Sequence, residues 1–349
     1  MYKYNSIDIL KFIASFFVVM IHVSMFSDVN PYLNLFITHG VARLAVPLYF
    51  LTSAFFFYKN NMNLTGEEQK NSLLKYTKRM AILYVSWFVI SLPMTVYNRF
   101  IYNGKPFLEN LFLFIKSFFL TSTFSGSWFL VACIFSVWVL YFVLNKSFKD
   151  QNQVNWLIIG ICCFVYLICV ICSAYGKIFS IFGLENLYKK IVYLTAKPYN
   201  SIIVGLPYFV IGRYFAQKDI HLTKFSKLLV ILCFVLLFIE IFLTYKFELK
   251  IASDCYFMLL PCASFIFVFI KNINVELKFK PVILRKTSTI IFFSHFIFIF
   301  TIEIFERFLN VNVNPLLRFP IVCCLSLILA FVLIKLTKFE KFNFIKHLY

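Results

Sequence analysis

Long apolar stretches recur along the whole chain, and short polar segments separate them. A helix that crosses a bilayer needs about 20 mostly apolar residues, and about ten stretches meet this requirement. The pattern therefore predicts an all-α, polytopic integral membrane protein with about ten transmembrane helices. The predicted spans are 7–26, 37–58, 78–97, 126–145, 154–174, 198–216, 227–246, 254–271, 287–306 and 317–336.

The first of these spans carries a polar stripe. Ten residues separate Lys11 from His22, which places both on one side of an α-helix, about 16 Å apart along its axis. Asp8 and Ser15 fall on the same arc, whereas the positions around it are Ile, Leu, Phe, Val or Met. Ionisable side chains at membrane depth are costly and by default mark a functional pathway. We therefore expect Lys11 and His22 to open into one shared cavity that crosses much of the bilayer.

The composition supports a membrane location. Hydrophobic residues make up 61% of the 349 residues and charged residues only 14%, which excludes an ordinary soluble domain. The net charge of +19 follows helix ends rather than one continuous patch, which argues against a nucleic-acid partner. About two thirds of the 34 Lys and Arg residues fall in segments that are cytoplasmic if the N-terminus is inside. This bias predicts that both termini are cytoplasmic.

The rest of the chain adds no separate module. Residues 1–349 are expected to form a single transmembrane domain without an appended soluble domain. Two predicted outer loops, 98–125 and 175–197, are longer than the others, and residues 107–120 within the first have a helix-like pattern too short to span. An interfacial or re-entrant helix is expected there. The ten cysteines show neither a disulfide framework nor zinc-type spacing, so no metal is expected.

Two histidines within predicted spans are candidates for proton transfer. For His22 the functional interpretation is a general base that deprotonates an acceptor hydroxyl as it attacks an acyl carbonyl. The alternative is a hydrogen-bonded packing histidine. His295 shares a helix face with Ser288, and its alternative role is a hydrogen bond to a neighbouring serine or backbone carbonyl.

Arginine 43 lies in the second span, where His39, Arg43 and Pro47 follow at helical spacing on one face. A structural role would pair the Arg43 guanidinium with a carboxylate such as Glu240 or Glu303. A functional role would be a clamp on an anionic group or a donor to a developing oxyanion. Both interpretations remain open from the sequence.

A basic cluster follows the second span. Lys75, Lys78 and Arg79 are candidates to bind the phosphates of a cytoplasmic cofactor. A cluster that only sets membrane orientation has the same composition, so this alternative also stays open.

Several segments follow a familiar pattern. The first span reads NSIDILKFIA at residues 5–14 and is followed by His22, and the second reads RLAVPLYFLTSAFFF at residues 43–57. Together they resemble the acyltransferase-3 family of bacterial integral-membrane acyltransferases, whose first helix carries a basic residue, ten intervening residues and a histidine. Further similar segments, which extend the resemblance over essentially the whole chain, are KYTKRM at 75–80, SWFL at 127–130, LPYFVIGRY at 206–214 and IIFFSH at 290–295.

The resemblance implies a reaction. Such a protein would move an acyl group, commonly acetyl, from cytoplasmic acyl-CoA to a hydroxyl of an extracytoplasmic cell-envelope carbohydrate. Its partners would be acyl-CoA, a cell-envelope glycan or lipid-linked sugar, and the lipids of the bacterial plasma membrane. His22, Arg43 and His295 are the candidate catalytic residues under this resemblance, and the candidate donor-binding residues are Lys11, Lys75, Lys78 and Arg79.

Two other classes of function remain. One is a transporter of a modified polysaccharide or an amino acid, which is an option because members of the family are fused to amino-acid racemase domains. The chain shows neither that fusion nor the paired broken helices expected of secondary transporters. The other is a membrane scaffold for a partner enzyme, and the polar stripe argues against it.

Overall fold

The computed structural model describes residues 4–102, 106–121, 123–124, 126–144, 156–218, 220 and 224–349. Within these ranges the regular structure is helical and no strand occurs. The predicted all-α class is confirmed. The elements are α1 (Asn5–Val23), α2 (Pro31–Leu33), η1 (Asn34–Thr38), η2 (Val41–Leu44), α3 (Ala45–Asn61), α4 (Gly66–Val96), η3 (Tyr97–Tyr102), α5 (Phe107–Leu120), α6 (Trp128–Val143), α7 (Trp156–Ser173), α8 (Ile178–Ile181), α9 (Glu185–Thr195), η4 (Pro198–Asn200), α10 (Gly205–Gln217), α11 (Lys224–Lys246), α12 (Leu259–Lys271), α13 (Val282–Leu309), α14 (Pro315–Leu336) and η5 (Glu340–Leu348).

Each predicted span coincides with helical structure, but the helices differ in length. Among the described residues, six helical segments are long and apolar enough to cross a membrane. The helices α6, α7 and α12 are apolar but shorter, and α10 has only 13 residues. At 1.5 Å per residue, 13 residues cover about 20 Å, less than the hydrocarbon core of roughly 30 Å. The molecule is thus an all-α polytopic membrane protein whose long and short spans are mixed.

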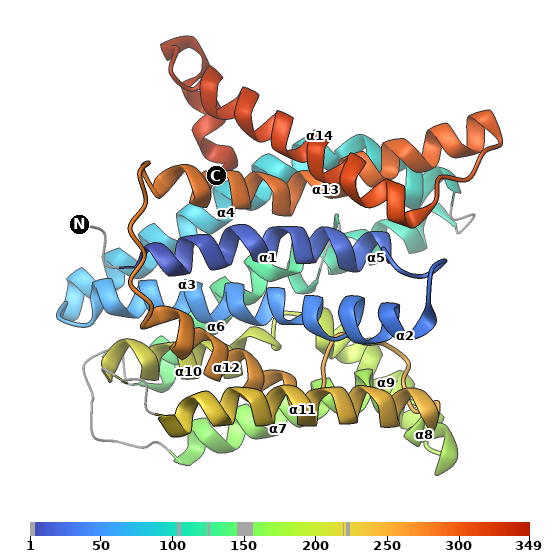
Figure 1. Ribbon diagram of the computed structural model, residues 1–349, viewed down its shortest axis with the longest axis horizontal. Coiled ribbons are helices and arrows are strands. Elements are labelled where there is room, and N and C mark those ends of the chain that lie inside the picture. The colour runs from blue at the N-terminus through green and yellow to red at the C-terminus, as the bar shows by residue number, and fades with distance from the viewer. Residues whose placement is uncertain are drawn as a thin grey trace.

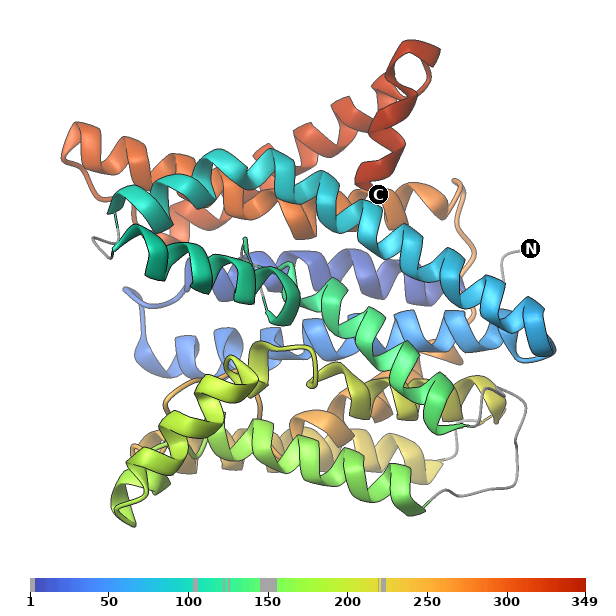
Figure 2. The same ribbon diagram turned by 180° about the vertical axis from the view of Figure 1, so that it is seen from behind.

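The two N-terminal spans form the centre of the molecule. In Figure 1, α1 and α3 run antiparallel side by side, with α13 and α14 on one side and α12, α11 and α7 on the other. Seen from behind, α4, α5 and α6 cover this centre (Figure 2). The first span therefore packs among other helices, chiefly α13, α3 and α14.

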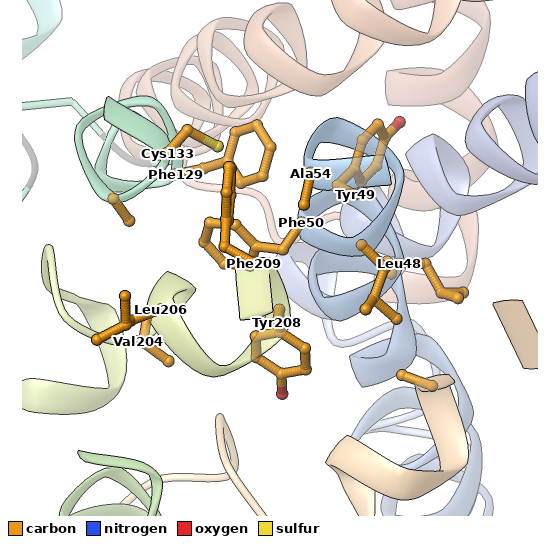
Figure 3. Packing of buried hydrophobic residues seen from close by; sticks show 14 of the residues in the cluster. Leu48, Tyr49, Phe50, Ala54, Phe129, Cys133, Val204, Leu206, Tyr208 and Phe209 are labelled. Carbon is orange, nitrogen blue, oxygen red and sulfur yellow. The ribbon is translucent and has the colours of Figure 1, made fainter. Parts of the chain in front are cut away.

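The short helix α10 lies against α3 because small residues let the two backbones approach. A Cβ atom added at Gly212 would lie 2.5 Å from the Cβ atom of Ala54, and one at Gly205 would lie 2.9 Å from the ring of Phe50. Figure 3 shows Phe50 between these helices, near Tyr208 and Phe209 of α10. This contact fixes the middle of α3, a helix that begins just after Arg43.

Two sequence predictions need correction. The predicted spans 37–58 and 78–97 leave residues 59–77 as a connecting cytoplasmic loop, but α4 begins at Gly66, so the basic cluster lies on a helix. The second span was expected to be one helix with His39, Arg43 and Pro47 on one face. Instead it passes from a π-helical turn through Gly40 into a 3-10 turn before α3 begins, and of these three residues only Arg43 and Pro47 line the cavity beside His22.

The two ends of the described chain lie on the same side of the molecule. Asp8 near the start of α1 pairs with Arg285 near the start of α13. The C-terminal segment η5 folds back beside them, where the ammonium of Lys286 lies 4.4 Å from the ring centroid of Tyr349. The sequence predicts that this side faces the cytoplasm. We call this the inner end, and the opposite end the outer end.

Candidate functional site

Two histidines from different helices meet near the outer end. His22 lies in the last turn of α1, and His295 lies in the middle of α13. Their ring centroids are 5.4 Å apart, and the ring of Phe296 packs against both. The His22 side chain is exposed, whereas His295 is fully buried. The structure therefore brings together the two predicted histidines and leaves only one accessible.

The buried histidine has a defined hydrogen bond. Nδ1 of His295 lies 3.0 Å from the carbonyl oxygen of Ile291. A carbonyl only accepts, so this contact assigns the proton to Nδ1 and leaves a lone pair on Nε2. Nε2 is buried and has no hydrogen-bond partner among the described residues. The predicted contact with a backbone carbonyl is thus present, and it occurs together with the contact to His22.

Arg43 has a different partner from the one expected. Its Nη1 lies 2.5 Å from Oδ1 of Asp254, and both side chains are largely shielded, with exposed fractions of 16% and 23%. Glu240, one of the expected partners, instead accepts hydrogen bonds from the backbone N–H groups of Phe257 and Met258. Pairing of Arg43 with Glu240 or Glu303 is therefore wrong, because the loop before α12 supplies a nearer carboxylate.

Two adjoining cavities open beside His22 at the outer end. The first, of about 80 Å³, is lined by His22, Arg43 and Asp254 together with aromatic side chains. The second, of about 520 Å³, shares His22 and Trp128 with the first. His22 and Arg43 thus face a common space, as expected if they act on one substrate.

The predicted donor-binding residues gather at the inner end. Lys11, Lys75 and Arg79 line a cavity of about 480 Å³, together with the Asp8–Arg285 ion pair. Lys75, Lys78 and Arg79 line an adjoining cavity of about 260 Å³, to which the C-terminal segment contributes Lys346 and His347. All four predicted cations therefore border one basic region that a phosphorylated molecule could occupy.

The inner and outer cavities are separate. None of the described residues lines both an inner cavity and a cavity beside His22. A layer of aromatic rings lies between them, in which the centroid of Phe129 is 4.7 Å from Phe50, 6.0 Å from Tyr49 and 5.6 Å from Phe292. Tyr49 also donates a hydrogen bond of 2.8 Å to the carbonyl oxygen of Lys11. We call Tyr49, Phe50, Phe129 and Phe292 the aromatic layer. The expectation of one shared cavity is wrong for this conformation, because large side chains from α3, α6 and α13 fill the middle.

The sequence patterns missed several residues of the outer cavities. Asp254, Tyr199 and Asn200 line the smaller cavity and lie at the first residues of the predicted spans 254–271 and 198–216. Arg99 and Lys116 line the larger one. The available signal was their position, since charged and aromatic residues at the outer ends of spans face the same compartment.

Comparison with known proteins connects this arrangement to a family. A family model described as an acyltransferase domain matches residues 4–335. The chain belongs to the acyltransferase-3 family. Membership in this family and the apolar helices together make it a multi-pass membrane protein that carries an acyltransferase domain.

Curated relatives of this acyltransferase-3 protein are longer than the chain itself. One protein named amino-acid racemase, from Enterococcus faecalis, is 25% identical over 344 residues, which are 97% of this chain and 47% of the relative. Another of the same name and organism is 27% identical over 260 residues, which are 74% of this chain and 34% of the relative. The chain therefore spans less than half the length of these relatives. No solved structure matches it.

Proposed function

We propose that this protein is a membrane O-acyltransferase of the bacterial plasma membrane. It transfers an acyl group, most simply acetyl, from cytoplasmic acyl-CoA to a hydroxyl of an extracytoplasmic cell-envelope carbohydrate or lipid-linked sugar. Family membership supports the acyltransferase class. The donor, the acceptor and the roles of the residues are proposals that rest on the two groups of cavities.

The basic region at the inner end suits the donor. CoA carries several phosphate groups, and Lys and Arg side chains are the usual protein partners of phosphate. The chain offers Lys11, Lys75, Lys78 and Arg79 around two adjoining cavities. Among the described residues that line them, Asp8 alone has a carboxylate side chain, and it is paired with Arg285.

The histidine pair suits the chemical step. In the proposed reaction a ring nitrogen of His22 accepts the proton of the acceptor hydroxyl while the hydroxyl oxygen attacks the thioester carbonyl. The carbon–sulfur bond then breaks, an ester bond forms, and the proton passes to the departing CoA thiolate. Arg43 lines the cavity next to His22, so it can stabilise the negative oxygen of the tetrahedral intermediate.

One observation carries this proposal. His22 is exposed to the outer cavities while its ring is held against buried His295 and Phe296. A histidine that only served packing would be covered on all sides, whereas a base must be both held in place and reachable. The aromatic layer adds a condition, because transfer across the protein requires these rings to move apart.

The direct test measures transfer of labelled acetyl from acetyl-CoA in inside-out membrane vesicles. His22→Ala should lower transfer by at least about 100-fold, the usual contribution of a general base. His39→Ala is the matched control, because His39 lines none of the cavities described above and its variant should keep normal transfer. Full transfer by His22→Ala would contradict the assignment.

A second arm tests the donor site. Lys75→Gln and Arg79→Gln should each raise the KM for acetyl-CoA by about tenfold and leave kcat nearly unchanged. This is expected because residues that hold the donor phosphates bind the ground state and the transition state equally. Lys59→Gln serves as control, because Lys59 is exposed at the end of α3 and lines neither inner cavity. An unchanged KM in both variants would place the donor elsewhere.

One feature favours the transporter alternative. The second span is interrupted at Gly40 between a π-helical and a 3-10 turn, and interrupted helices border the substrate sites of many transporters. Uptake of a labelled amino acid into right-side-out vesicles, without any acylated product, would support transport instead of transfer.

A further inference from the structure

The larger outer cavity is lined by cations. It has a volume of about 520 Å³ and is lined by residues of η3, α5 and α9 and by the start of α6. Arg99, Lys116 and Lys197 line it together with His22. None of the described residues that line it carries a carboxylate. The cavity that reaches the candidate base is therefore strongly positive.

These three cations form no ion pair with any residue that the structure describes. Nη2 of Arg99 donates a hydrogen bond of 3.1 Å to Oγ of Ser117. The other terminal nitrogen, Nη1, is buried without a hydrogen-bond partner within the described ranges. A buried donor without a partner is costly, and most such groups meet a ligand or an ordered solvent molecule.

One of these cations is held in place by contacts with α9. Nζ of Lys116 lies 3.9 Å from the ring centroid of Tyr193 and also donates a hydrogen bond to the Tyr193 carbonyl oxygen. Lys197 is exposed in the turn that follows α9. The contacts to Tyr193 therefore hold the Lys116 charge at the cavity.

The three cations lie at the outer end of the molecule, where membrane orientation does not account for them. Membrane proteins concentrate Lys and Arg on the cytoplasmic side, so basic residues at the outer end are not explained by orientation. Neighbouring like charges without a counterion repel one another. A ligand that brings negative charge removes this repulsion and satisfies Arg99.

We propose that this cavity binds the acceptor through an anionic group, so that the acceptor is an acidic saccharide. The recognised chemistry is a carboxylate or phosphate on or beside the sugar whose hydroxyl faces His22. The rings of Trp128 and Tyr193 also line the cavity and offer flat apolar surfaces to a sugar ring. This inference rests on the proposed function for the role of the hydroxyl, but the binding of the anion does not depend on acyl transfer.

The test uses the purified full chain and three probes that share one ring: glucose, glucuronic acid and glucose 6-phosphate. Binding is followed by the change in tryptophan fluorescence, and Trp128→Phe identifies the signal from the cavity. The acidic sugars should bind at least about tenfold more tightly than glucose, and their advantage should shrink at high salt because screening weakens charge pairing. Glucuronic acid against glucose 6-phosphate then shows which anion is preferred.

Two variants test the residues. Arg99→Gln and Lys197→Gln should each weaken binding of the preferred acidic sugar by about tenfold and leave glucose binding unchanged. Lys197 is exposed, so its variant is expected to fold. Lys189→Gln is the matched control, because Lys189 is an exposed residue of α9 that does not line the cavity.

The outcomes separate this inference from the proposed function. Equal binding of glucose and the acidic sugars, or unchanged affinity in both variants, would overturn the anionic acceptor even if acyl transfer occurs. Binding of acidic sugars by a chain that transfers no acyl group would support the cavity assignment and contradict only the acyltransferase proposal.

Discussion

The rings of His22 and His295 lie side by side, tilted by 34° with 5.4 Å between their centroids, although α1 and α13 supply them from opposite ends of the chain. The two helices pack along each other, and Phe296 touches both rings. Only His22 reaches the cavities, whereas His295 is covered and bonded to the Ile291 carbonyl. The pair therefore divides into an accessible group and a buried group that positions it.

This division predicts the effect of His295→Gln. The glutamine amide can still donate to a backbone carbonyl, but it provides no imidazole beside His22. We expect kcat for acetyl transfer to fall by about tenfold or more while KM stays nearly unchanged, because His295 lines none of the outer cavities. The double variant with His22→Ala should be no slower than His22→Ala alone. Independent, multiplying effects in the double variant would contradict the positioning role.

The ion pair between Arg43 and Asp254 predicts a stability change. Removing one partner of a shielded pair leaves an uncompensated charge, and the exposed fractions of 16% and 23% make this pair intermediate between surface and core. Asp254→Asn should therefore cost about 2 kcal/mol, a value between those of surface and buried pairs. The measurement is thermal unfolding in detergent, where Tm should fall by roughly 5 °C.

A second ion pair supplies the control for this measurement. Lys177 and Glu248 lie 3.4 Å apart with exposed fractions of 50% and 82%. Lys177→Gln should change stability by less than about 0.5 kcal/mol, because solvent screens an exposed pair. An equal loss of stability in both variants would mean that the Arg43–Asp254 pair stabilises the protein no more than an exposed ion pair does.

Hydropathy and spacing were sufficient for much of the architecture. The apolar stretches predicted the helices of the bundle, and the pattern of residues 107–120 predicted α5 with its observed bounds. The spacing of Lys11 and His22 correctly placed the two residues toward opposite ends of α1, with the basic cluster at the inner end. These features depend on local sequence, which periodicity reports directly.

Other features depended on contacts between distant segments. The partner of Arg43 is decided by the path of the loop before α12, which uses Glu240 for its own backbone N–H groups and presents Asp254 instead. The aromatic layer was missed because a helical face says nothing about which rings from α6 and α13 fill the space next to it. The break at Gly40 was missed because the hydropathy of the second span is continuous.

The contact between α3 and α10 predicts opposite effects for two glycine substitutions. A methyl group at Gly212 would lie 2.5 Å from the Cβ atom of Ala54 and 3.0 Å from the carbonyl oxygen of Leu51. Gly212→Ala should therefore destabilise the protein by about 1–3 kcal/mol through overpacking. Gly160→Ala should instead stabilise it by up to about 1 kcal/mol, since Gly160 lies within helix α7 with nothing within 4 Å of its added Cβ.

Thermal unfolding of both variants in the same detergent distinguishes packing from helix propensity. If alanine at both positions raised Tm, helix propensity would dominate and the close approach of α3 and α10 would be incorrect. A lowered Tm at Gly212 alone would support the contact between α10 and the middle of α3.

The aromatic layer predicts a change in accessibility. Phe129 contacts three other rings of the layer, so Phe129→Ala should leave a gap between the inner and outer cavities. A cysteine placed by Lys11→Cys should then react with a membrane-impermeant maleimide added from the outer side, whereas the same cysteine with Phe129 present should stay protected. Mass spectrometry at residue 11 gives the extent of labelling independently of the native cysteines.

Phe142→Ala is the control for this experiment, because Phe142 lies on the same helix α6 but is 57% exposed and lines none of the described cavities. Its variant should leave residue 11 protected. Protection that persists in folded Phe129→Ala protein would mean that Tyr49 and Phe292 close the layer without Phe129. Labelling of residue 11 with Phe129 present and without added acyl-CoA would contradict the closed layer that this prediction assumes.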